Sequence, residues 1–258
     1  MQIPVAVKST ASHFYKYSNL EHPEWLRSII LEHKLYVPTL PQLNDPADGR
    51  PRLETLSEEE LASFLHDAFV KDNPGLTKDK YEQEKLALPS KIKLLGVDWF
   101  VREMSSLLNR ELDGYRVYSM SKRYDNLSLW DRYGAHHSGY CLEFSNEGPF
   151  FQHAKEVIYG ESTRMDVTNR EHRSGYWFFC KRQEWSNEEE IRLVGIRKQG
   201  PTVLIDPKWL TRIILGKDIV EPHRKLIMVW AKERRPELEV TSAKYDQFHQ
   251  NLILELAG

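Results

Sequence analysis

The sequence predicts an α+β protein built on a mixed or antiparallel central sheet, with a helical insert near residues 57–112. Apolar residues recur at helical spacing through that insert, whereas from residue 115 onward they alternate with polar residues, as in strands. The helices and strands do not repeat as βαβ units, which favours α+β over α/β. No internal repeat or linker-like stretch divides the chain, so we expect a single domain over residues 1–258.

The chain begins with three short elements. We expect a strand at residues 14–17, a helix that starts near Pro23, and a second strand at residues 35–37. Apolar residues at helical spacing after the proline indicate the helix, and Pro38 ends the second strand. The composition of Asn44-Asp45-Pro46 is typical of a turn.

The insert at residues 57–112 has helical patterning throughout. Ser57 and Glu60 have the spacing of a capping box, which places a helix start there. We expect Pro89 to break the pattern and an amphipathic helix to follow over residues 92–108. The insert carries few chemically active side chains, so we expect it to pack beside the sheet or to form a lid.

The second half of the chain supplies most of the sheet. Strands are expected at residues 115–121, 139–144, 156–159, 190–194, 203–205, 213–215, 238–240 and 252–256. Helices are expected near residues 170–182 and 221–234.

Composition narrows the class of protein. Of the 258 residues, 40% are hydrophobic and 11% aromatic, which is enough to bury a core and argues against a disordered chain. Neither Cys141 nor Cys180 belongs to a Cys-x-x-Cys pair, so a zinc or disulfide scaffold is not expected. The sequence shows neither a signal-peptide pattern nor an apolar run of about 20 residues. We therefore expect a cytoplasmic protein without a membrane partner.

The formal net charge of −2 gives no broad basic surface for nucleic acid. Basic residues do gather around the most acidic motif of the chain, either as a binding patch or as a solvated surface. They are Arg164, Arg170, Arg173, Lys181, Arg182, Arg197 and Lys198.

The segment Glu188-Glu189-Glu190-Ile191-Arg192 is the strongest candidate for a chemical centre. As the start of a strand, it turns Ile191 toward the core and places Glu188, Glu190 and Arg192 on the opposite face. Neighbouring carboxylates push each other's pKa values apart, and the guanidinium keeps one of them ionised. From spacing alone, the alternative is an exposed row of charges beside a buried stripe.

A second cluster begins at Ser119 and Ser121, which alternate along a strand so that both hydroxyls share one face. Asn126, Trp130 and Tyr133 follow, and the two aromatic residues are neighbours if their segment is helical. Hydroxyls beside aromatic rings suit a flat ligand that also carries hydroxyl groups. Ordinary packing of a half-buried strand is the alternative.

A third cluster, Tyr15-Lys16-Tyr17-Ser18, places a cation between aromatic residues and suits a phosphate or a sugar. An edge strand with an exposed lysine is the other explanation. The adjacent His136 and His137 point to opposite faces of an extended chain, so we expect no metal site there. The sequence has no glycine-rich phosphate-binding fingerprint and no G-x-S-x-G elbow.

In their order and spacing, these pieces resemble the bacterial domain-of-unknown-function family 2971. The resemblance covers most of the chain and rests on short motifs. They are Tyr15-Lys16-Tyr17, Asn44-Asp45-Pro46, Ser119-x-Ser121 with Asp125-Asn126, Trp130-x-x-Tyr133, Gly139-Tyr140-Cys141-Leu142-Glu143-Phe144, Val157-x-Tyr159, Lys181-x-x-x-Trp185-x-x-Glu188-x-Glu190-x-Arg192 and Ile213-Ile214-Leu215-Gly216.

The layout also resembles the ADP-ribosyltransferases, whose core carries three separated motifs. The aromatic–basic start at Tyr15-Lys16-Tyr17 is similar to the first, although that superfamily usually has His or Arg where Lys16 stands. Ser119-Met120-Ser121 is similar to the second, and Glu188-Glu189-Glu190 to the Glu-x-Glu third. This resemblance implies a split, ADP-ribosyltransferase-like sheet and NAD as the substrate.

It further implies roles for individual residues. Glu190 would stabilise the positive charge that develops on the ribose, and Glu188 would orient or deprotonate the acceptor. The NAD-binding residues would be Tyr15, Lys16, Tyr17, Ser119, Ser121, Asn126, Trp130, Tyr133 and Arg192. The acceptor would be a nucleic acid or a protein, and such enzymes often act as toxins or in phage defence.

Two other functions fit the same residues. One is a metal-dependent nuclease or phosphodiesterase that uses Glu188, Glu190 and Asp45 with magnesium and has Lys181 nearby. The other is a sensor module that binds a nucleotide without turning it over.

Overall fold

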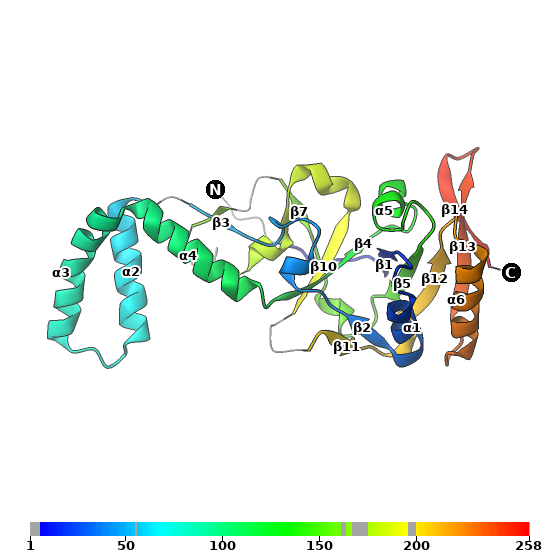
Figure 1. The fold of residues 1–258 in the computed structure, drawn as a ribbon, viewed down its shortest axis with the longest axis horizontal. Helices are drawn as coiled ribbons and strands as arrows, with labels where there is room; N and C mark the ends of the chain where they lie inside the picture. Colours follow the sequence, from blue (N-terminus) through cyan, green and yellow to red (C-terminus); the bar gives the residue numbers. More distant parts are fainter. Residues whose placement is uncertain (1–5, 55, 161–163, 167–174, 196–199, 258) are drawn as a thin grey trace.

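The computed structural model describes residues 6–54, 56–160, 164–166, 175–195 and 200–257. Its centre is an eight-stranded sheet with the strand order β14-β13-β12-β5-β1-β4-β10-β6 (Figure 1). The strands are β1 (His13–Ser18), β4 (Arg116–Ser121), β5 (Tyr140–Ser145), β6 (Lys155–Glu156), β10 (Glu190–Gly195), β12 (Leu210–Leu215), β13 (Glu239–Asp246) and β14 (Asn251–Leu256). Only β12 and β13 pair in parallel within this sheet, so the prediction of an α+β fold with a mixed sheet is confirmed.

Three smaller strand pairs flank the main sheet. They join β2 (Lys34–Tyr36) to β11 (Thr202–Leu204), β3 (Arg52–Leu53) to β8 (Arg164–Met165), and β7 (Ile158–Tyr159) to β9 (Cys180–Lys181). The single strand expected at residues 156–159 is therefore two strands, β6 and β7, which belong to different sheets.

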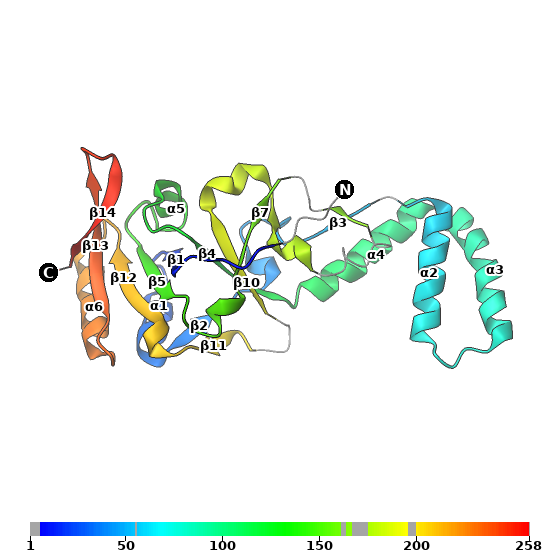
Figure 2. The same cartoon turned by 180° about the vertical axis from the view of Figure 1, so that it is seen from behind.

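The helices are α1 (Pro23–Glu32), α2 (Glu58–Asp72), α3 (Lys78–Leu95), α4 (Val97–Leu112), α5 (Leu127–Arg132) and α6 (Glu221–Glu233). The expected capping box starts α2: Ser57 Oγ accepts from the Glu60 N–H at 3.1 Å, and Glu60 accepts from the Ser57 N–H at 2.8 Å. Helices α2 and α3 form a hairpin that projects from the sheet at the end of α4 (Figures 1 and 2). No helix within the described ranges is long and apolar enough to cross a membrane.

Two predictions about helices were wrong. Pro89 does not end a helix but lies inside α3, which packs against α2 on the projecting hairpin and continues through the proline. The helix ends instead at Gly96, which has a φ of +83°. In place of a helix up to residue 182, Tyr176–Phe179 is a single 3₁₀ turn followed by β9. Residues 170–174 lie outside the described ranges.

The aromatic composition of that turn explains the second error. Tyr176, Trp177 and Phe178 are all buried in one apolar cluster. Consecutive residues of an α-helix point in directions that differ by roughly 100°, so a surface helix cannot bury three in a row on one side.

The two faces of the sheet pack against different clusters. Helices α1 and α6 cover one face, where they meet Tyr118, Met120, Ile191 and Leu193. The other face carries the aromatic turn and α4 over β4 and β10, and α5 over β1 and β5. The prediction that Ile191 points into the core is confirmed, and Leu193 lies in the same cluster. Alternation therefore places Ser119, Ser121, Glu190 and Arg192 together on the opposite face.

Strands β1 and β4 diverge. β1 pairs with β5 along its whole length, from His13↔Ser145 to Ser18↔Tyr140, and β4 pairs with β10 from Ser121↔Glu190 to Arg116↔Gly195. Between β1 and β4, however, the register contains one pair, Tyr15↔Ser121. The opening beyond that pair positions the candidate site.

Candidate functional site

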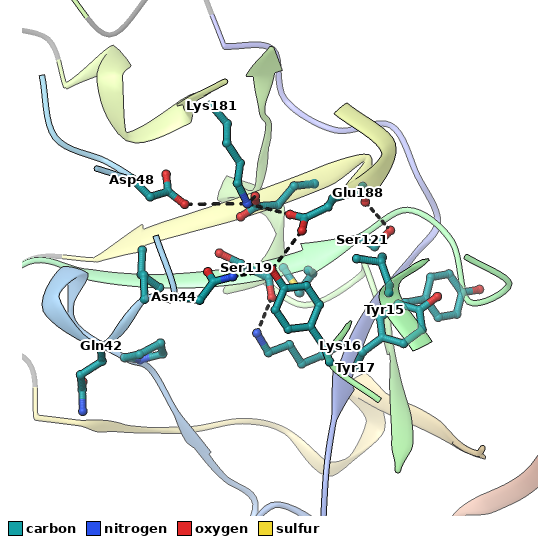
Figure 3. A pocket seen from close by; sticks show the side chains of 16 residues that line it. Tyr15, Lys16, Tyr17, Gln42, Asn44, Asp48, Ser119, Ser121, Lys181 and Glu188 are labelled. Carbon is teal, nitrogen blue, oxygen red and sulfur yellow. Dashed lines mark hydrogen bonds and ion pairs between the residues drawn. The ribbon is translucent and has the colours of Figure 1, made fainter. Parts of the chain in front are cut away.

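A cavity of about 250 Å³ lies where β1 and β4 separate (Figure 3). Its walls come from β1, β4, β10, α5 and the turn that precedes β3. The lining residues are Tyr15, Lys16, Tyr17, Pro38, Gln42, Leu43, Asn44, Asp48, Ser119, Met120, Ser121, Leu129, Tyr133, Lys181, Glu188 and Glu190.

Three carboxylates surround the Lys181 ammonium on one side of this cavity. Lys181 Nζ lies 2.6 Å from Glu188 Oε2, 2.9 Å from Glu190 Oε2 and 3.8 Å from Asp48 Oδ2. All four side chains are buried. Burial lowers the pKa of Lys181, but Glu190 and Glu188 outweigh that effect and raise it above the ordinary lysine value. Lys181 therefore stays charged and holds the carboxylates together.

Arg192 lies behind Glu190 and is fully buried. Its Nε and Nη2 donate to the two oxygens of Glu190 at 2.6 and 3.0 Å, and its Nη1 and Nη2 donate to the two oxygens of Asp48 at 2.8 and 2.6 Å. Nη1 also donates to the Phe178 carbonyl at 2.8 Å. A guanidinium that binds two carboxylates in this forked manner fixes their orientation.

Glu190 is an ionised carboxylate near neutral pH. Burial raises its pKa, but Arg192, Lys181 and a hydrogen bond from Ser119 together lower it to about 2. With donors from all three neighbours, its two oxygens are largely occupied. Glu190 can therefore supply a fixed negative charge, whereas a group with so low a pKa is a poor proton acceptor near neutral pH.

Glu188 lies at the open side of the same cluster. Its Oε1 accepts from Arg132 Nη1 at 2.9 Å and from the Tyr133 hydroxyl at 3.0 Å. Burial and the nearby Glu188 carboxylate raise the pKa of Tyr133 to about 12, so its hydroxyl remains a donor. Asn44 Nδ2 in turn donates to the Tyr133 oxygen at 3.0 Å. This chain of contacts connects Glu188 to the exposed rim of the cavity.

Glu188 reaches the carboxylate cluster through a turn that side-chain alternation along a strand did not predict. Glu188 ends the 3₁₀ helix Gln183–Glu188 and is not on a strand; β10 begins at Glu190. Glu189 between them has a left-handed backbone with a φ of +46°, and its carboxylate lies 3.4 Å from Arg123 Nη1. Ser121 Oγ stabilises the turn by donating to the Glu188 carbonyl at 2.8 Å.

Trp185 covers the cluster from the 3₁₀ helix. The Arg132 guanidinium lies 4.5 Å and Lys181 Nζ lies 4.9 Å from the centre of its ring. Both cations also bind Glu188, so the indole and the carboxylate hold them from two sides.

Lys16 lies on the far side of the cavity, where β1 leaves β4. Its Nζ donates a hydrogen bond of 2.9 Å to the Ser119 carbonyl (Figure 3). That carbonyl has no partner on β1, because the two strands have already diverged at this point. The same Nζ lies 5.2 Å from the centre of the Tyr118 ring. Burial lowers the pKa of Lys16 below the ordinary lysine value, and Glu190 and Glu188 offset this only in part. With one hydrogen bond of this kind, an ammonium retains donors for a ligand.

The structure brings eight of the predicted site residues to this cavity: Tyr15, Lys16, Tyr17, Ser119, Ser121, Tyr133, Glu188 and Glu190. It places three elsewhere. Asn126 caps α5 by accepting from the Ser128 and Leu129 N–H groups. Trp130 is fully buried, donates to the Tyr124 carbonyl at 2.7 Å and packs edge-on against Tyr17, so it presents no open face to a ligand. Arg192 is shielded from the cavity by Glu190.

Sequence reasoning missed Asp48, and it placed Lys181 in the basic patch and, beside the carboxylates, only in the metal-dependent alternative. Nothing near Asp48 in the sequence marks it, whereas Lys181 lies only seven positions before Glu188. The acidic residue chosen for the metal-dependent site, Asp45, instead accepts from Arg182 Nη2 at 3.0 Å. Within the described ranges, no three His, Cys, Asp or Glu side chains are arranged to hold a metal ion. Lys181 and Arg192 instead occupy the space between the carboxylates.

The expected basic patch is only partly described. Arg170, Arg173, Arg197 and Lys198 lie outside the described residues, as does the side chain of Arg164. Lys181 is buried in the carboxylate cluster. Arg182 is exposed and pairs with both Asp45 and Glu184 at 3.0 Å, so its charge is balanced locally.

No family model matches the sequence, and no match was found among curated proteins or solved structures.

Proposed function

We propose that this protein is an NAD-dependent ADP-ribosyltransferase-like enzyme, which cleaves the bond between nicotinamide and ribose and transfers ADP-ribose to a nucleic-acid or protein acceptor. One observation carries the proposal. Three polar clusters that are far apart in sequence, Tyr15–Tyr17, Ser119 with Ser121, and Glu188 with Glu190, line one cavity from β1, β4 and the start of β10. The resemblance described above assigns the same three clusters to an NAD site.

The reaction needs a fixed negative charge near the ribose. When the bond from ribose C1′ to the nicotinamide nitrogen breaks, its electron pair leaves with nicotinamide and the sugar becomes oxocarbenium-like. Glu190 is held as an anion by Arg192 and Lys181 and can stabilise this charge without any reorganisation. The new bond forms between C1′ and a nucleophilic atom of the acceptor, which gives its proton to Glu188.

The size of the cavity favours the reacting end of NAD. Pockets that enclose a drug-sized ligand usually measure roughly 300–1,000 Å³, whereas this cavity measures about 250 Å³. We place nicotinamide and its ribose inside, with the ring on Tyr133 and a ribose or phosphate oxygen at Lys16. The rest of the dinucleotide extends over Gln42 and Asn44, which are exposed at the rim.

The test is incubation of the purified protein with NAD, alone and with cell lysate, followed by detection of free nicotinamide and of ADP-ribosylated material. Nicotinamide release together with a labelled nucleic acid or protein is the expected result. Binding of NAD without any product would support the sensor alternative instead. Hydrolysis of nucleic acid that a metal chelator stops would support the nuclease alternative.

By analogy with the enzymes that the chain resembles, we further propose a role as a toxin or phage-defence effector. Induced expression in a bacterial host should then slow growth and lower the cellular NAD content, and a catalytically inactive variant should do neither.

A further inference from the structure

A second and larger cavity lies at the end of α4. Its volume is about 780 Å³, which falls within the roughly 300–1,000 Å³ typical of small-molecule pockets. Among the described residues, it shares no lining residue with the first cavity. Its walls come from the end of α4, from β6 and β10, and from the aromatic turn Tyr176–Phe179, and we refer to it as the aromatic cavity.

The inner wall of the aromatic cavity is built from rings. Tyr115 and Phe178 lie with ring centres 4.9 Å apart, and Trp177 lies 5.9 Å from Phe178. Trp177 and Phe178 are buried, whereas Tyr115 and Phe179 are partly exposed. Partly exposed rings at the edge of a hollow offer stacking surfaces for a flat ligand.

Three basic residues and one acidic residue lie at the rim of the cavity. Lys8, His153 and Lys155 line it and are exposed, as is Glu111. Lys8 and Lys155 face each other directly across an isolated antiparallel bridge, and Lys155 Nζ lies 5.2 Å from the Phe179 ring centre. Like charges at directly opposed positions of a strand pair destabilise each other. An anion between the two ammonium groups would remove that repulsion and would lie beside the exposed rings.

We propose that the aromatic cavity binds a nucleotide, with the base stacked on Tyr115 and Phe179 and the phosphate between Lys8 and Lys155. The ligand is either a free mononucleotide or the end of a single strand, which present the same base and phosphate. The site does not depend on NAD turnover in the first cavity. The walls of the two cavities are nevertheless linked, because Arg192 donates both to Glu190 of the first cavity and to the carbonyl of Phe178 in the aromatic cavity.

Calorimetric titration of the 258-residue chain tests the site with four probes. They are AMP, adenosine, inorganic phosphate and a short 5′-phosphorylated oligoadenylate. We expect AMP to bind more tightly than adenosine or phosphate, because the site uses both the ring and the charge. Tighter binding of the oligoadenylate than of AMP would identify a strand end as the natural ligand; the reverse order would identify a free nucleotide. No binding of either would overturn the proposal.

Variants separate this site from the first cavity, because AMP is also one half of NAD. The double substitution Lys8→Glu and Lys155→Glu should weaken AMP binding by about tenfold or more, since it replaces two charge-assisted contacts by repulsion. Lys208→Glu is the control: Lys208 is also exposed and lines neither cavity. It should leave AMP binding unchanged, and an equal loss in this control would refute a specific site.

Lys16→Met completes the comparison, because Lys16 belongs to the first cavity alone. We expect this variant to retain AMP binding. If Lys16→Met loses AMP binding while the Lys8 and Lys155 double variant keeps it, the nucleotide occupies the first cavity and the proposal is wrong. Failure of NAD turnover in the wild-type protein would contradict the proposed function without affecting this result.

Discussion

Arg192 binds Asp48, a residue 144 positions earlier in the chain, through two hydrogen bonds of 2.8 and 2.6 Å. Both side chains are buried, and the same guanidinium binds both oxygens of Glu190. One side chain thus joins the turn that precedes β3 to the strand that carries the candidate charge-stabilising carboxylate. The position of Glu190 in the cavity depends on this contact.

The first prediction concerns Asp48→Asn. The substitution leaves the buried Arg192 with one carboxylate instead of two, so it should lower the free energy of unfolding by about 3–5 kcal/mol. Urea denaturation measures the effect. Glu255→Gln, which breaks the exposed Lys244–Glu255 pair of 2.9 Å, is the control and should cost less than about 1 kcal/mol. Equal effects of the two substitutions would show that the Asp48–Arg192 contact is not a structural link.

Asp48 also marks the limit of what the sequence can predict. Alternation was sufficient to place Ser119 with Ser121 on one face of β4, and Glu190 with Arg192 on one face of β10, because side-chain alternation within a strand is a local property. The convergence of β1, β4 and β10 depends on strand order, which no local pattern encodes. The contacts of Asp48 likewise exist only after folding.

The difference between local patterns and contacts made on folding also explains the wrong predictions for Glu188, Asn126 and Trp130. Glu188 reaches the cavity through a left-handed residue at Glu189, and a glutamate gives no sign of that conformation in the sequence. Trp130 and Asn126 belong to motifs that look functional, yet they pack and cap α5. An aromatic or polar residue looks the same in the sequence whether it binds a ligand or packs against and caps a helix.

The second prediction is a loss of stability in acid through Glu190. Its pKa is about 2 in the folded protein against an ordinary value of 4.5, so the unfolded state binds more protons between these values. The stabilisation is therefore complete above pH 4.5 and declines as pH falls toward 2. Denaturation measured across this range should show a steeper decline for the wild type than for Glu190→Gln. Identical slopes would mean that Glu190 titrates normally.

The third prediction concerns Lys16. Its pKa is lowered in the folded protein, so it loses its charge at a lower pH than an ordinary lysine. If it contacts a phosphate or ribose oxygen, NAD affinity should fall as pH rises from neutral toward 10.5, the ordinary value. Lys16→Arg keeps its charge throughout that range and should show a flatter profile. The same decline in both proteins would exclude Lys16 as its source.

The fourth prediction concerns the proline within α3. Pro89 is exposed and lies in the helix interior, where it removes a backbone donor and disturbs the preceding turn. Pro89→Ala should therefore raise the free energy of unfolding by about 1–3 kcal/mol. Pro222, in the first turn of α6, is the control, because proline is tolerated there and its replacement should bring no gain. Thermal or urea denaturation of both variants decides the matter; a destabilising effect of Pro89→Ala would show that the hairpin requires the proline.

The fifth prediction is the most direct test of the proposed function: release of nicotinamide from NAD by the wild type, Glu190→Gln and Glu189→Gln. Glu189 neighbours Glu190 in sequence but does not line the cavity, so its variant should turn over NAD at the wild-type rate. Glu190→Gln should lose a factor of about 10²–10³ or more, because it removes the fixed charge near the ribose. Circular dichroism at the assay temperature confirms that both variants are folded. A folded Glu190→Gln protein that releases nicotinamide at the wild-type rate would contradict the account.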